Sequence, residues 1–134
     1  MATTRKEPAG RTPVAPYLAV GLSTVVHGVG SRKDIAQNLD IIEDAIHAAM
    51  GIISINMPVK LIALAEGALT GFTDEAFDVP HVTAARELFI DVPGEETERL
   101  AGLARMYEMF LLVQCKSRWP EVMPDRYFNT LFVI

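Results

Sequence analysis

The sequence has a single cysteine and lacks any apolar run long enough to cross a membrane. One cysteine in 134 residues excludes an internal disulfide and fits a reducing compartment, so we expect a cytoplasmic protein. A transmembrane helix needs about 18 consecutive apolar residues, and without such a run we expect no membrane partner. The three histidines lack the spacing of a metal site. We expect neither a metal nor a cofactor.

Basic residues are in the minority. Twelve Lys and Arg against seventeen Asp and Glu give a net charge of −5, and no basic patch with interleaved aromatic residues occurs. This composition argues against nucleic-acid binding. Residues 1–16 contain basic residues and prolines but no apolar core of a secretory signal, so we expect a disordered leader there, with a weakly basic organelle-targeting peptide as the alternative. Residues 17–134 have the length of one domain.

Residues 61–72 are the most informative stretch. Five apolar residues, 61–65, end at the carboxylate of Glu66. Such a run is typical of a strand buried on both faces, and ligands of open α/β folds bind outside the carboxyl ends of strands. Gly67 and Gly71 bracket a tight turn. Glu66 is therefore a candidate general acid or base; the alternatives are a strand-end carboxylate in water or a structural ion pair.

The hydrophobic pattern predicts alternating strands and helices. Residues 31–50 have an apolar stripe at helical spacing (Ile35, Leu39, Ile42, Ile46, Ala49), with Ser31 and Asp34 as a capping box and Gly51 as a stop. Residues 51–60 are apolar but interrupted by Pro58, which leaves a short strand and a buried loop as alternatives. The remaining predictions are strands at 17–26, 59–66, 110–115 and 126–134, a helix at 95–109, a short helix within 83–89 and a hairpin-like connection at 119–125.

The predicted order is β-α-β-α-β-β, an α/β layered fold. The second helix has an apolar stripe too, formed by Leu100, Leu103, Ala104 and Tyr107.

Other chemical motifs match only in part. Cys115 ends an apolar run, whereas a catalytic thiol needs an electropositive, partly exposed site, so we expect Cys115 in the core. Residues 28–31 resemble the start of a dinucleotide fingerprint, but Lys33 stands where the third glycine belongs. Ser23 lacks the second glycine of a hydrolase elbow. Surface or capping roles are expected for His27, His47 and His81.

Four segments together resemble the nitrilase, or carbon–nitrogen hydrolase, superfamily. Residues 61–72 resemble its first catalytic motif, and Asn38-Leu39 with Ile42 resembles its first helix. Residues 92–104 resemble its second helix entry, and residues 127–130 resemble its Tyr-Asn-Thr strand. The resemblance covers roughly residues 18–134 in the family's order. This sequence departs from the family at Ala65, where proline is usual, at Ser23-Thr24, where glutamine is common, and at 51–58, which resembles an insertion.

The resemblance implies half of a nitrilase-type α-β-β-α sandwich whose subunits pair as a homo-oligomer. The family cleaves non-peptide carbon–nitrogen bonds with a glutamate base, a lysine that stabilises the tetrahedral intermediate and a cysteine nucleophile. Glu66 matches the glutamate. The family's lysine and cysteine follow the Tyr-Asn-Thr strand, where this sequence ends, so neither is matched. Cys115 precedes that strand.

We therefore expect residues 17–134 to be a partial, truncated carbon–nitrogen hydrolase domain, inactive alone, from an enzyme acting on a small-molecule amide or nitrile. The alternative is a non-catalytic half-fold interaction module that pairs through its open sheet, because the last predicted strand presents an apolar edge. The resemblance leaves amide and nitrile substrates equally open, since the residues that shape the acyl pocket lie mostly in the other half of the family's fold.

Overall fold

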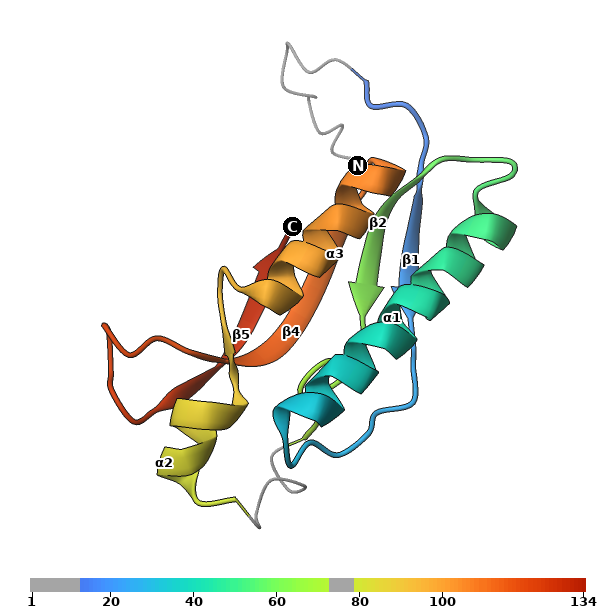
Figure 1. Ribbon diagram of the computed structural model, residues 1–134. Coiled ribbons are helices and arrows are strands. Elements are labelled where there is room, and N and C mark those ends of the chain that lie inside the picture. Colours follow the sequence, from blue (N-terminus) through green and yellow to red (C-terminus); the bar gives the residue numbers. More distant parts are fainter. Residues whose placement is uncertain (1–12, 73–78) are drawn as a thin grey trace, which may run out of the picture.

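The computed structural model describes residues 13–72 and 79–134 (Figure 1). Residues 1–12 of the expected leader lie outside the described residues, while residues 13–16 are exposed and belong to no helix or strand. The described residues form a mixed α/β structure with one five-stranded sheet. None of the helices in 13–72 or 79–134 is long and apolar enough to cross a membrane.

Four strands of the sheet are parallel and lie in the order β1-β2-β4-β3, and β5 pairs antiparallel with β4. The strands are β1 (Leu18–Leu22), β2 (Val59–Leu64), β3 (Ile90–Asp91), β4 (Phe110–Arg118) and β5 (Tyr127–Val133).

β4 contacts three other strands. β5 pairs with it along one edge from Leu112 to Arg118, so β2 and β3 must share the opposite edge. The β2 ladder ends at the pair Ala63↔Leu112, and the β3 ladder begins at Ile90↔Ser117. The edge of β4 between these two ladders is therefore free to accept the turn that follows β2.

Two long helices, α1 (Arg32–Ile53) and α3 (Glu95–Tyr107), lie side by side across one face of the sheet (Figure 1). The predicted stripes face the sheet because apolar residues at helical spacing share one side of a helix. In β4, side chains alternate between the two faces of the sheet, so every second residue points toward the helices, and Leu111, Val113 and Cys115 are buried there. The buried stripe residues are Ile35, Leu39, Ile42, Ile46, Leu100, Leu103 and Ala104.

The predicted element order is confirmed, with additions. A short helix, α2 (His81–Thr83), continues into one π-helical turn, η2 (Ala84–Leu88), and the two-residue β3 follows. These elements occupy the region predicted to contain a short helix within 83–89. Residues 73–78 lie outside the described residues. The predicted hairpin connection is also present, because β4 and β5 are adjacent antiparallel strands.

Two predictions around the end of α1 are wrong. Gly51 does not stop the helix, which continues to Ile53. Its C-cap is Ser54, whose amide and hydroxyl both donate to the carbonyl of Met50, at 3.4 and 2.5 Å. Residues 51–58 form neither a strand nor a buried loop, because all eight are exposed as the last turn of the helix and the turn after it.

Two strand predictions also need correction. The first strand ends at Leu22 rather than at residue 26, because its partner strand ends at the paired residue Leu64. The second strand is not buried on both faces. Val59 and Ile62 are buried, whereas Leu61 on the other face is only half-buried. Helices cover one face only among the described residues, so the opposite face lacks the cover that a doubly buried strand requires.

Candidate functional site

The turn after β2 is tight and depends on its glycines. The amide of Ala65 donates to the carbonyl of Leu22 at 3.1 Å, and the amide of Gly71 donates to the carbonyl of Gly67 at 2.8 Å. Gly67 and Gly71 have φ angles of 76° and 66°, in the left-handed region that side chains disfavour. The predicted role of the two glycines is confirmed.

Side chains and backbone of β4 hold this turn from the other side. The amide of Gly67 donates to Gln114 Oε1 at 2.8 Å, and the amide of Lys116 donates to Thr70 Oγ1 at 2.8 Å. The Lys116 ammonium also donates to the carbonyl of Gly71. The turn therefore replaces a strand along the free stretch of the β4 edge, and its backbone finds hydrogen-bond partners there.

Asn38 of α1 ties the helix layer to the same turn. Its side chain is buried and donates to the carbonyl of Leu69 at 3.2 Å and to that of His27 at 3.4 Å. A buried amide in an apolar helix face is costly unless it is bonded, so these two bonds account for its place in the core. The motif turn is thus fixed by β1, β4 and α1 together.

Glu66 is exposed, whereas the five residues after it, 67–71, are buried. The structure therefore places its carboxylate at the carboxyl edge of the sheet, in contact with solvent, on a backbone that is held firmly. No ion pair to Glu66 occurs within residues 13–72 and 79–134, so the structural-pair alternative has no support in this part of the chain.

Cys115 lies in the core, as predicted. It is fully buried on β4, and burial, together with the charge of Glu96, raises the pKa of the thiol to about 12. The thiolate is the nucleophilic form of cysteine, and this environment disfavours it at neutral pH. Cys115 therefore does not provide a reactive thiol beside the motif turn.

His47, His81 and the start of α1 have structural partners, and His27 is exposed. His47 Nδ1 lies 2.6 Å from the Tyr107 hydroxyl, and the His81 ring stacks 4.6 Å from that of Tyr127. At the helix start, the Asp34 carboxylate accepts from the amide and the hydroxyl of Ser31, both at 2.8 Å, which lowers the pKa of Asp34. A side-chain carboxylate thus occupies the position that a nucleotide phosphate would need. Among the described residues, no three His, Cys, Asp or Glu side chains converge as metal ligands would.

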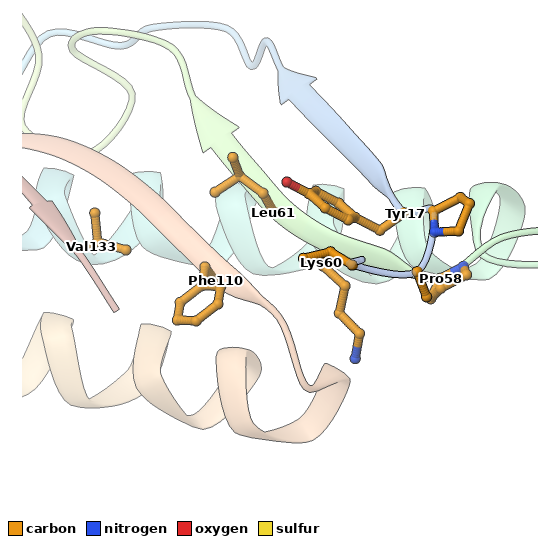
Figure 2. Close-up of a pocket in the computed structure, with 9 residues that line it drawn as sticks. Tyr17, Pro58, Lys60, Leu61, Phe110 and Val133 are labelled. Carbon is orange, nitrogen blue, oxygen red and sulfur yellow. The ribbon is translucent and has the colours of Figure 1, made fainter. Parts of the chain in front are cut away.

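The sheet face opposite the helices exposes apolar side chains. Phe110 of β4 is 61% exposed, and Leu131 and Val133 of β5 are 64% and 60% exposed. Leu61 and Phe110 lie next to each other on adjacent strands and line an apolar groove of about 730 Å³ with Tyr17, Pro58, Lys60 and Val133 (Figure 2). We call the face formed by Phe110, Leu131 and Val133 the open face.

Gln114 was the part of the site that sequence reasoning missed. Its only local signal is a polar residue inside the apolar run of residues 110–115. Positions 110, 112 and 114 share the open face because side chains alternate along a strand. A polar residue on that otherwise apolar row could have been noted as a candidate partner for a neighbouring turn.

A comparison with known protein families gives a match that includes the motif turn and the strands and helices around it. A model of the family described as carbon-nitrogen hydrolase matches residues 19–134, which is most of the chain. A search of curated proteins found no match.

Proposed function

Because the chain belongs to the carbon–nitrogen hydrolase family, we propose that it supplies the general base of a hydrolase acting on a small-molecule amide or nitrile. One observation carries the proposal. Glu66, which matches the family's catalytic glutamate, is exposed at the carboxyl edge of β2 while the turn beside it is buried and bonded. An accessible carboxylate on a fixed backbone supports this role, because a general base must be held within hydrogen-bond reach of the proton that it accepts.

In the proposed reaction with an amide, Glu66 accepts the proton of a cysteine thiol. The thiolate adds to the carbonyl carbon, and a lysine stabilises the negative oxygen of the tetrahedral intermediate. The carbon–nitrogen bond then breaks, the nitrogen leaves with a proton as ammonia or an amine, and water releases the acid from the thioester. Cys115 does not fill the nucleophile's role, because it is buried and its pKa is about 12. The proposal therefore needs a lysine and a cysteine from polypeptide beyond these 134 residues.

The decisive variant is Glu66→Gln, made in an active protein that contains residues 1–134 with the family's lysine and cysteine. Glutamine keeps the shape of the side chain but cannot act as a base, so kcat should fall by about 10²- to 10⁴-fold. The melting temperature should stay unchanged, because Glu66 is exposed. Glu98→Gln, at an exposed position in the first turn of α3, is the matched control and should keep full activity.

Measuring kcat and the melting temperature on the same sample separates the two roles of Glu66. A loss of rate with unchanged stability supports the general base. A sharp drop in melting temperature would instead indicate a structural ion pair. Full activity in Glu66→Gln would remove the base assignment.

A second candidate function rests on the open face. Phe110, Leu131 and Val133 expose more than half of their surface in a chain whose other sheet face is covered. A non-catalytic interaction module that pairs through this face, with a second copy or another protein, also fits that observation. The reading frame after the Ile134 codon discriminates the two. A continuation that encodes a lysine motif and a cysteine favours the hydrolase, and an immediate stop codon favours the module.

A further inference from the structure

Glu66 stands between two backbone amides that are held by different strands. The amide before it, of Ala65, donates to Leu22 at the end of β1, at 3.1 Å. The amide after it, of Gly67, donates to the side chain of Gln114 on β4, at 2.8 Å. We propose that Gln114 is a positioning residue for Glu66, an inference that rests on the proposed function of Glu66 as a base.

The orientation of the Gln114 amide group is set from β5. Its nitrogen donates to Asn129 Oδ1, which leaves its oxygen to accept from Gly67. Asn129 pairs with Lys116 in the register, two positions along the same face from Gln114, so the two side chains can meet. A chain of hydrogen bonds thus runs from β5 across β4 to the residue beside Glu66.

The sheet itself cannot provide this bond. The β2 ladder with β4 ends at Ala63↔Leu112, so the amide of Gly67 has no strand partner beyond that point. Gln114 replaces the missing backbone acceptor with a side-chain carbonyl. The two preceding residues on the same face of β4, Phe110 and Leu112, are apolar, so a polar side chain at position 114 has its partners in the turn and on β5 rather than along this part of β4.

The rest of the turn has anchors of its own. Thr70 accepts from the amide of Lys116, and Leu69 accepts from Asn38. Loss of the Gln114 bonds should therefore loosen Glu66 and Gly67 locally and leave the remainder of the turn in place. A local effect of this kind distinguishes a positioning residue from one that maintains the whole fold.

The first experiment measures amide hydrogen exchange in the 134-residue chain. In Gln114→Met, which keeps the length of the side chain but not its hydrogen bonds, exchange at Gly67 should accelerate about fivefold, the factor for a net bond of about 1 kcal/mol. The amide of Lys116 should keep its protection, because Thr70 still accepts from it. Gln37→Met, at an exposed position on α1, is the matched control. Unchanged exchange at Gly67 would overturn the inference.

The second experiment measures kinetics in the active hydrolase. Gln114→Met should lower kcat by about 10- to 100-fold with KM kept within about twofold, because a displaced base misses its proton while substrate binding persists. Gln114→Glu keeps an acceptor for Gly67 and should restore most of kcat.

The outcomes separate this inference from the proposed function. If Glu66→Gln is inactive and Gln114→Met is fully active, Glu66 remains the base and Gln114 is not a positioning residue. If Glu66→Gln is fully active, the base assignment fails whatever Gln114 does. If Gln114→Met does not fold, Asn129→Ala, at an exposed position, tests the same bond chain. It should then accelerate exchange at Gly67, and no change there would overturn the inference.

Discussion

Replacing Gly67 with alanine tests whether the turn beside Glu66 has the backbone described above. An L-residue in the left-handed region costs about 1–2 kcal/mol, and the φ angle of Gly67 is 76°. An added Cβ would also lie 3.2 Å from a methyl group of Val26 and 3.3 Å from the ring of Phe72. The reduced entropy of the unfolded chain offsets about 0.4–1 kcal/mol of this cost. We expect Gly67→Ala to lower the free energy of unfolding by about 1 kcal/mol.

Gly102→Ala is a control with the opposite expected sign. Gly102 lies in α3, where an added Cβ would meet nothing within 4 Å. Alanine is the better helix former by about 1 kcal/mol, so this variant should be more stable than the parent chain. The two substitutions add the same methyl group, and their effects should differ by about 2 kcal/mol.

Urea unfolding followed by Trp119 fluorescence measures both variants. The protein concentration should stay below about 1 μM, under the range in which exposed strands associate. A two-state fit with an unchanged slope gives the difference in free energy. If Gly67→Ala is as stable as the parent chain, residue 67 does not have the left-handed backbone conformation described above. The fixed backbone assigned to Glu66 would then be wrong.

Three further predictions concern the 134-residue chain alone. At about 50 μM it should self-associate through its open face, and light scattering should show a smaller species when Leu131 and Val133 are both replaced by threonine. The chain should also hydrolyse neither amides nor nitriles, because its one thiol, Cys115, is buried. Burial raises the pKa of the Cys115 thiol to about 12 and keeps the thiol from solvent, so iodoacetamide should label Cys115 slowly at pH 8 until urea is added.

Each of these predictions has a result that contradicts it. A monodisperse monomer at about 50 μM would show that the open face does not drive self-association. Rapid labelling of native Cys115 at pH 8 would show that the thiol is accessible. Turnover of an amide that Cys115→Ala abolishes would make this residue a nucleophile and would overturn its assignment to the core.

Local patterns determined much of the fold. The spacing of Ile35, Leu39, Ile42 and Ile46 specifies the face that α1 buries, because helical periodicity depends only on neighbours in sequence. The apolar run before Glu66 and the glycines at 67 and 71 likewise predict a strand followed by a tight turn, and both are present. Local patterns failed at Gly51. The residue type predicts a helix end there, but the helix continues to Ile53 and Ser54 is its C-cap.

Tertiary structure decided the rest of the site. The partner of the Gly67 amide is Gln114, 47 residues away in sequence, and the partner of Asn38 is Leu69, 31 residues away. No local pattern specifies such pairs, because they depend on which strands share an edge of β4.

The exposure of Glu66 is also a tertiary result. The exposure depends on which other segments pack over the carboxyl edge of the sheet, and the sequence of the turn does not specify those segments. The sequence by itself therefore determined the residue that the motif presents and the family that the motif indicates. The positions of β1, β4 and α1 around the turn determined how that residue is held, since hydrogen bonds between distant segments form only after the sheet has assembled.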